Sequence, residues 1–241
     1  GTMNVLGVAG EVPLRELAAV GDTPTFTQPK RHFHVIAGGS LTLRYLELTG
    51  GRVYTVYDGS QTTWYTGGTQ FGGTVMVEGA GARLDVFSSV FSGCGGVACA
   101  YYGGAVFARE TADVVIHSST FQSCTAESTG GAMWVENGVK LHIADSVFES
   151  NQAASQHGGA LRILRDSIVV IEDSTFVSNT AKQHGGAIFS QYNSSVTVRS
   201  SCFENNIAIE NDGGAIHSYC NDAAQCDRHA LHLYQVNFTG N

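Results

Sequence analysis

The chain has 241 residues, of which 43% are hydrophobic and 14% are charged, and its formal net charge is −8. This acidic balance, with only 13 Lys and Arg, argues against a nucleic-acid-binding protein, in which basic residues are numerous and clustered. No apolar run is long enough to cross a bilayer as a helix, so we expect no insertion of this segment into a membrane.

The N-terminal region differs from the rest of the chain. Residues 1–3 are typical of an expression-tag remnant and carry no information on the fold. Residues 11–20 predict a short amphipathic helix, which would cover the open end of a solenoid. We therefore expect a scar and cap over residues 1–37 and one β-helix domain over residues 38–241. Because the chain ends at Asn241, on a repeat turn, we expect a fragment of a longer protein.

The tripeptide Gly-Gly-Ala recurs five times at nearly constant spacing. The intervals between the first glycines are 27 or 28 residues. These glycines are Gly103, Gly130, Gly158, Gly185 and Gly213. A period of this length indicates a solenoid, because each repeat can bury its apolar face only against its neighbours.

A phenylalanine recurs in phase with the glycines and closes an alternating apolar run. The phenylalanines are Phe91, Phe121, Phe148, Phe176, Phe203 and Phe238. Three positions after them come Cys94, Cys124, Asn151, Asn179, Asn206 and Asn241. A serine two residues before most of these phenylalanines breaks the alternation, which predicts a bend between two short strands.

These patterns predict an all-β fold. The repeats are rich in Val, Ile, Thr, Ser and Phe, and they lack apolar residues at helical spacing. We predict a right-handed parallel β-helix of about six to seven coils, with three short strands per coil. The recurring Asn should form a side-chain ladder, since Asn tolerates left-handed backbone and its amides can bond from coil to coil. The glycine pairs should mark a turn that needs a positive φ or a close backbone approach.

The six cysteines are consistent with an oxidising compartment, and none forms a metal-binding Cys-x-x-Cys pair. Cys220 and Cys226 bracket a short insertion, and we predict a disulfide between them. Cys94 could pair with Cys124 on the next coil or with the nearby Cys99. Alternatively, several of the cysteines are free buried thiols.

The combined Gly-Gly-Ala-apolar and Phe-x-x-Asn signature resembles the repeats of chlamydial polymorphic membrane proteins and related repeat proteins. The matching residues are Gly130-Gly131-Ala132-Met133 with Phe148-Glu149-Ser150-Asn151, Gly158-Gly159-Ala160-Leu161 with Phe176-Val177-Ser178-Asn179, and Gly185-Gly186-Ala187-Ile188 with Phe203-Glu204-Asn205-Asn206. The resemblance covers roughly residues 35–241. It implies a surface-exposed passenger domain, often an adhesin. The Phe-x-x-Cys copies at Phe91 and Phe121 depart from the family pattern.

The strand after each Gly-Gly-Ala is expected to expose a stripe of side chains. An apolar residue follows each tripeptide and should point inward, so the next residue should face outward and stack at about 4.8 Å from coil to coil. The outward residues are Phe107, Trp134, Arg162, Phe189 and His217. An exposed row of rings with polar neighbours suits recognition of a sugar face or a protein. Alternatively, a long loop or another chain covers the stripe.

A second row precedes the glycine pairs and contains His157, His184 and Asp212. Two imidazoles about 5 Å apart, with a carboxylate one coil further on, could ligate a metal or act as general acid and base. Turn residues that recur through repeat duplication would give the same pattern. We therefore expect no metal, no cofactor and no catalytic residue.

An insertion between Thr49 and Phe71 carries aromatic residues. Long insertions on a solenoid map to one face, frequently the binding face. Tyr57, Trp64 and Tyr65 are therefore further candidate binding residues. Alternatively, the loop packs these rings over the side of the solenoid.

The preferred function is an extracellular or cell-surface, non-catalytic β-helix that presents a recognition surface, as an adhesin, a glycan- or protein-binding module, or a scaffold. Its expected partner is a cell-surface glycan or protein, and the sequence makes no prediction of oligomeric state. The alternative is a polysaccharide-active enzyme, a lyase, hydrolase or epimerase with a site in a lateral groove. A hydrolase needs paired carboxylates, whereas Glu149 and Glu172 fall on different strands. Ice binding would need a flat threonine array, and the outward row around Thr120 and Thr175 is too mixed.

Overall fold

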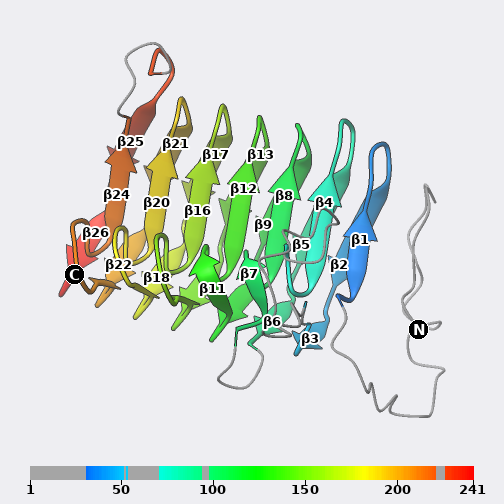
Figure 1. Cartoon of the computed structure of the whole chain (residues 1–241), viewed down its shortest axis with the longest axis horizontal. Helices are drawn as coiled ribbons and strands as arrows, with labels where there is room; N and C mark the ends of the chain where they lie inside the picture. The colour runs from blue at the N-terminus through cyan, green and yellow to red at the C-terminus, as the bar shows by residue number, and fades with distance from the viewer. Residues whose placement is uncertain (1–30, 52, 54–70, 94–97, 221–225) are drawn as a thin grey trace, which may run out of the picture.

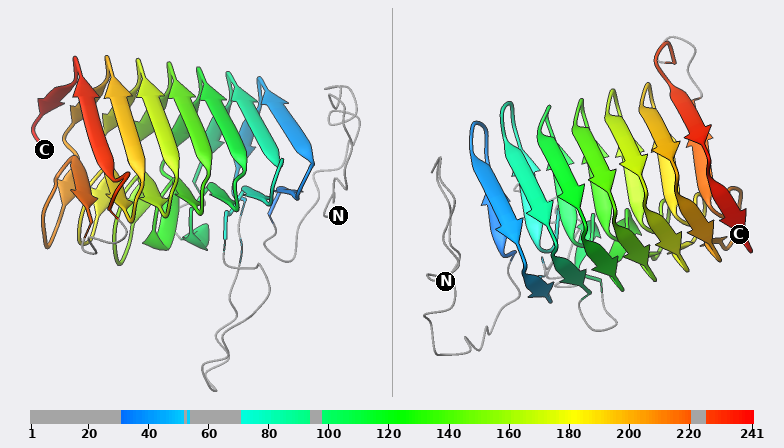
Figure 2. Two further views of the ribbon diagram at one scale, coloured as in Figure 1. Left: turned by 90° about the horizontal axis from the view of Figure 1, so that it is seen from above. Right: turned by 180° about the vertical axis from the view of Figure 1, so that it is seen from behind.

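The chain folds into an elongated parallel β-solenoid, whose coils stack along the long axis of the molecule (Figures 1 and 2). The computed structural model describes residues 31–51, 53, 71–93, 98–220 and 226–241. Within these ranges every regular element is a strand, and no helix is present that could cross a membrane. The prediction of an all-β parallel solenoid is confirmed.

Two sheets contain strands of mostly four or five residues. Sheet A consists of β1 (Phe33–Val35), β4 (Val75–Glu78), β8 (Val106–Arg109), β12 (Met133–Glu136), β16 (Leu161–Leu164), β20 (Ile188–Gln191) and β24 (Ile216–Tyr219). Sheet B consists of β2 (Ser40–Arg44), β5 (Arg83–Phe87), β9 (Asp113–His117), β13 (Lys140–Ala144), β17 (Ile168–Glu172), β21 (Ser195–Arg199) and β25 (Ala230–Tyr234). In both sheets each strand pairs in parallel with the equivalent strand of the next coil.

Two further sheets contain strands of two or three residues, except for the five-residue β11. Sheet C consists of β3 (Glu47–Thr49), β6 (Val90–Ser92), β10 (Thr120–Gln122), β14 (Val147–Glu149), β18 (Thr175–Val177), β22 (Cys202–Glu204) and β26 (Asn237–Thr239). Sheet D consists of β7 (Ala100–Tyr102), β11 (Thr125–Thr129), β15 (Gln152–Ala153), β19 (Thr180–Ala181) and β23 (Ile207–Ala208). The bend between sheets B and C falls at the predicted serine.

A complete coil runs from sheet D through sheets A and B to sheet C. Strands β7 to β26 make about five such coils, so the expected count of six to seven is not confirmed. Each complete coil has four strands rather than the predicted three, because the segment before each glycine pair also pairs from coil to coil, as Ala126 does with Ala153. The expected cap at residues 11–20 lies outside the described residues, and the right-handed sense of the coils stays a prediction.

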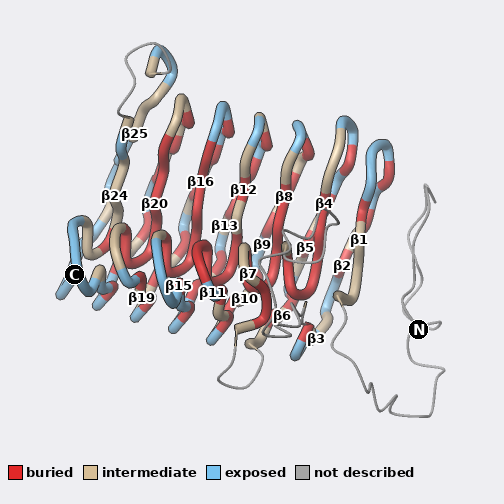
Figure 3. The backbone as a smooth tube through the Cα atoms, viewed as in Figure 1, coloured by how far each residue is buried: buried red, intermediate tan, exposed pale blue. Residues whose placement is uncertain are grey.

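The interior is organised around a stack of phenylalanine rings on sheet C. The rings of Phe91, Phe121, Phe148, Phe176 and Phe203 are fully buried. Successive ring centroids are 4.5–4.9 Å apart and the planes are within 6° of parallel. This distance equals the spacing of adjacent strands, so one ring per coil stacks without strain. Figure 3 shows where buried residues lie along the coils. The ring distances confirm the prediction of a stacked phenylalanine core.

The asparagine turn forms the predicted ladder. Asn151 Nδ2 donates to Asn179 Oδ1 at 2.9 Å, and Asn179 Nδ2 donates to Asn206 Oδ1 at 2.9 Å. The same Oδ1 atoms also accept a backbone N–H, and the second hydrogen of each Nδ2 goes to a phenylalanine carbonyl. Each buried amide is therefore fully paired. The left-handed residue is not the ladder Asn but the residue before it, Ser150 or Ser178.

The glycine pair meets both predicted requirements, one at each position. Gly158 has a φ of +66°, a conformation that side chains with a Cβ rarely adopt. A Cβ on Gly159 would lie 2.0 Å from the carbonyl oxygen of Gly186 on the next coil. The two glycines are thus required for different reasons, the first for its dihedral angle and the second for the close approach of neighbouring coils.

The cysteines match the predictions only in part. Cys220 and Cys226 form a disulfide, as predicted. Cys124 is a free buried thiol, so the pairing of Cys94 with Cys124 is wrong. Burial raises the pKa of Cys124 to about 12. Cys99 is disulfide-bonded, and Cys94 lies outside the described residues.

Candidate functional site

The outer face of sheet A carries the predicted stripe, with one residue from each coil. The pairing of successive strands places these residues side by side. They are Phe107, Trp134, Arg162, Phe189 and His217. The apolar residue before each of them packs toward the interior, so the predicted register is confirmed.

The stripe is not an exposed row, and that part of the prediction is wrong. Phe107, Phe189 and Arg162 are only 0%, 3% and 8% exposed. Trp134 and His217 are partly exposed. The cause is a second row of side chains, from the turns before the glycine pairs, which covers the stripe.

Each ring of this turn row packs on the stripe residue of the following coil. The centroid distances are 4.4 Å for Phe71 and Phe107, 4.3 Å for Tyr102 and Trp134, 4.5 Å for His157 and Phe189, and 4.5 Å for His184 and His217. The two rows therefore form one structure, which we call the lateral cluster. It consists of Phe71, Tyr102, Phe107, Trp134, His157, Arg162, His184, Phe189, Asp212 and His217.

The sequence contains a signal for this merger that the predictions did not use. In each coil a turn residue and a stripe residue flank the same Gly-Gly-Ala-apolar tetrapeptide, as His157 and Arg162 do. The left-handed first glycine, Gly158 in this coil, turns the chain so that both flanking side chains reach the outer face of sheet A. By the same rule Tyr102, which no prediction named, belongs to the cluster.

Arg162 lies in the middle of the lateral cluster. Its Cζ atom is 4.1 Å from the ring centroid of Phe189 and 6.0 Å from that of Trp134. Nη2 donates to Gln191 Oε1 at 3.2 Å, whereas Nε and Nη1 have no hydrogen-bond partner among the described residues. Burial lowers the pKa of Arg162 to about 9. The guanidinium is held mainly by aromatic faces, as in cation–π contacts, rather than by a carboxylate.

Three histidines occupy the C-terminal part of the cluster. The rings of His157 and His184 are 5.2 Å apart, and those of His184 and His217 are 4.5 Å apart. Burial, followed by the charge of Arg162, lowers the pKa of His157 to about 3. Burial and the neighbouring His184 also lower the pKa of His217, although Asp212 opposes this shift. His157 and His217 are therefore neutral at pH 7 and have a nitrogen lone pair available.

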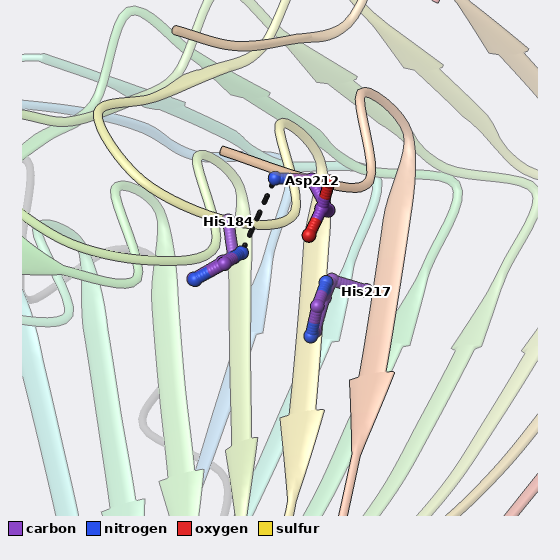
Figure 4. A group of neighbouring side chains, drawn as sticks. All are labelled: His184, Asp212 and His217. Atoms are coloured by element: carbon purple, nitrogen blue, oxygen red, sulfur yellow. Dashed lines mark hydrogen bonds between the residues drawn. The ribbon is translucent and has the colours of Figure 1, made fainter. Parts of the chain in front are cut away.

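The structure groups His184 with Asp212 and His217, not with Asp212 and His157 as the sequence suggests. One potential ligand atom from each residue lies within 4.8 Å of the other two (Figure 4). His184 and Asp212 occupy equivalent turns of neighbouring coils, and His217 lies on β24. The backbone N–H of Asp212 donates to His184 Nδ1 at 3.3 Å. Two imidazoles and a carboxylate at this separation are a possible metal-binding set.

The remaining candidates lie elsewhere. Tyr57, Trp64 and Tyr65 fall outside the described residues. Glu149 lies on β14 of sheet C, and Glu172 lies on β17 of sheet B. Glu172 is engaged by His142 and Arg199, each at 3.1 Å. The two carboxylates therefore do not form a facing pair.

Comparison with known proteins identifies one repeat type in this chain. Residues 173–191 and 200–219 match the Chlamydia polymorphic membrane protein (Chlamydia_PMP) repeat. Each segment contains the core phenylalanine, the ladder asparagine and the glycine pair of one coil. No curated protein and no solved structure matches the chain. The resemblance to this repeat is thus confirmed over two segments, in a chain that folds as a parallel β-solenoid.

Proposed function

We propose that this chain is a surface-exposed, non-catalytic β-solenoid that recognises a cell-surface glycan or protein through its lateral cluster. The observation that carries the proposal is the contrast between the repeated interior and the varied aromatic and charged residues gathered on the outer face of sheet A. Phenylalanine and asparagine recur in the interior of the coils, whereas the stripe on sheet A changes its residue type at almost every coil. Such variation is not needed for stacking, and a binding surface is a reason for it.

Only part of the stripe is accessible from outside. Tyr102, Trp134 and His217 are partly exposed, and Tyr219, whose ring centroid is 6.0 Å from that of His217, is 44% exposed. Phe107, Arg162 and Phe189 lie beneath them and hold their orientation. Rigid aromatic side chains with one free face are common anchors in recognition surfaces.

Charged groups border these rings on sheet A. Glu136, in the strand of Trp134, forms an ion pair with Arg165 at 3.1 Å. Burial raises the pKa of Glu136, although Arg165 and Arg109 oppose this shift. An apolar ring with polar groups at its edge suits either a sugar face or a polar protein surface.

The extracellular location is part of the same proposal. The disulfide between Cys220 and Cys226 is typical of a protein from an oxidising compartment. The two matches to the polymorphic membrane protein repeat support a location at the cell surface. Tyr57, Trp64 and Tyr65 remain candidate contacts from the insertion.

A binding assay with the intact chain tests this function. We expect binding to at least one glycan on an array or to a cell-surface protein, with at least about tenfold weaker binding by the double variant Trp134→Leu/Tyr219→Ala. Leucine keeps apolar volume over Phe107, so the variant should stay folded. The matched control is Tyr234→Ala on sheet B, where an aromatic residue is 51% exposed on another face. Wild-type binding by the double variant, or no binding to either ligand class, would refute the proposal.

A further inference from the structure

We infer that His184, Asp212 and His217 form a binding site for a divalent transition-metal ion such as Zn²⁺. The site shares His217 with the recognition surface but takes a different ligand, and its test uses substitutions at Asp212 and His184 rather than at the exposed aromatic rings. It reverses the expectation of no metal drawn from the sequence, where His217 was assigned to the stripe and not to the histidine row.

The repeat builds the site from two neighbouring coils. His184 and Asp212 directly precede Gly185 and Gly213. The two residues are one repeat apart, so they occupy equivalent turns of neighbouring coils. His217 pairs in register with Phe189 on β20, which brings its ring beside both turns. The three side chains therefore face one another without any help from an irregular loop (Figure 4).

The distances between the three ligand atoms are somewhat longer than in a metal-bound site, and binding of an ion would shorten them. The ligand atoms lie within 4.8 Å of one another. Bonds from zinc to imidazole nitrogen or carboxylate oxygen are about 2.0–2.2 Å, so ligand atoms around a tetrahedral ion lie about 3.3–3.5 Å apart. Asp212 is exposed and both histidines are half-buried, so small side-chain rotations can close the difference. The exposure also leaves room for water at a fourth position.

The side chains differ here from the other histidine–carboxylate contacts of the molecule. His117 bonds directly to Asp145 at 3.1 Å, and His142 bonds directly to Glu172 at 3.1 Å. In the described part of the chain the Asp212 carboxylate makes no such ion pair. It stands instead beside two rings that surround the same space. The backbone N–H of Asp212 donates a long hydrogen bond of 3.3 Å to His184 Nδ1, and a metal ion bound at this nitrogen would displace it.

The donor set selects the class of ion. Two imidazole nitrogens and one carboxylate suit zinc and other first-row transition metals. Calcium and magnesium prefer an all-oxygen set with six or more ligands. We therefore expect zinc to bind and neither calcium nor magnesium to compete with it.

Calorimetric titration of the intact, tag-free chain with Zn²⁺ tests the site. We expect one zinc ion per chain, and Asp212→Asn should lower the affinity at least about tenfold, because loss of a ligand costs more than loss of an outer-shell partner. The matched control is Asp145→Asn, which removes another exposed carboxylate beside a histidine. Cys202→Ser is the second control, because this half-exposed thiol is an alternative zinc ligand. Both controls should bind zinc as the wild type does.

Titration with Co²⁺, followed by its visible absorption, provides a second readout, which reports the coordination geometry in the wild type directly and is compared with variants shown by circular dichroism to be folded. The wild type should develop the bands of a tetrahedral ion, and Asp212→Asn and His184→Gln should lose them. The inference is overturned if zinc does not bind saturably, if Asp212→Asn binds it with wild-type affinity, or if Cys202→Ser abolishes binding.

Discussion

The interior of the solenoid and the outer face of sheet A are built from the same coils but follow opposite rules. Inside, phenylalanine recurs on sheet C and asparagine at the turn that follows it, because like side chains in register can stack and bond at the strand spacing. Phe176 and Asn179 are examples of these interior residues. Outside, the residue type changes along the stripe, from Trp134 to Arg162 to His217. The difference indicates that the interior determines the fold, whereas this face is free to carry chemistry.

The two regions also differ in how well their polar groups are paired. Each ladder amide, such as that of Asn179, uses both its hydrogens and its oxygen. The lateral cluster buries Arg162 with one hydrogen bond and holds His157 in its neutral form. Substitutions should therefore cost most in the ladders and least in the cluster.

The largest effect is expected in the phenylalanine stack. Phe176→Ala should lower the free energy of unfolding by about 3–5 kcal/mol, because it leaves a cavity between two stacked rings. Urea denaturation followed by circular dichroism measures this change. A loss below about 1 kcal/mol would show that the stack is not a determinant of stability.

The second-largest loss of stability is expected in the asparagine ladder. Asn179→Ala leaves the amide of Asn151 and the carbonyl of Phe148 without their partners, so we expect a loss of about 2–3 kcal/mol. Asn211→Ala, at an exposed turn, is the matched control and should change the same urea transition by less than about 0.5 kcal/mol. Equal losses in the two variants would contradict the ladder's role.

A small or favourable effect is expected at Arg162. Replacing a buried charge by an apolar side chain of similar length is often neutral or stabilising, so Arg162→Met should change the free energy of unfolding by less than about 1 kcal/mol. The same urea experiment measures it. A loss larger than about 2 kcal/mol would make Arg162 part of the structural framework and remove the contrast between the two regions.

The last prediction concerns pH. Burial lowers the pKa of His157 from its ordinary 6.5 to about 3. Below pH 6.5 the unfolded chain gains a proton that folded His157 does not accept until about pH 3, so stability should fall as the pH decreases through this window. His157→Gln should flatten this dependence, measured as urea midpoints between pH 7 and pH 4 with EDTA present. An unchanged dependence would show that His157 is not held neutral.

The sequence predicts the ladders well and the lateral cluster poorly, for one physical reason. Like residues at equal intervals stack from coil to coil, so the period alone places Phe148 above Phe121 and Asn179 above Asn151. The burial of the stripe depends on which way the turn before each glycine pair directs its side chain. That direction follows from the left-handed backbone of Gly158 and its equivalents, and the predictions did not combine this turn with the residues that flank each glycine pair.

The metal candidate illustrates the same limit. The repeat period alone predicts that His184 and Asp212 are neighbours, because both directly precede a glycine pair. His217 enters the group from a different row, because the turn row leans toward the following coil. The sequence pattern also does not predict the strands of sheet D. Strands such as β15 and β19 have two residues each, which is too short to give an alternating pattern.

The most direct test of the central claim measures stability and binding on one variant of the outer face. In Trp134→Thr/His217→Thr/Tyr219→Thr every ladder residue is unchanged, and three accessible rings are removed, two from the cluster and one beside it. We predict a cooperative urea transition with a midpoint above that of Phe176→Ala, together with loss of binding to the glycan or protein that the wild type recognises. A variant that unfolds at or below the Phe176→Ala midpoint, or that folds and still binds like the wild type, would contradict the division between a structural interior and a functional outer face.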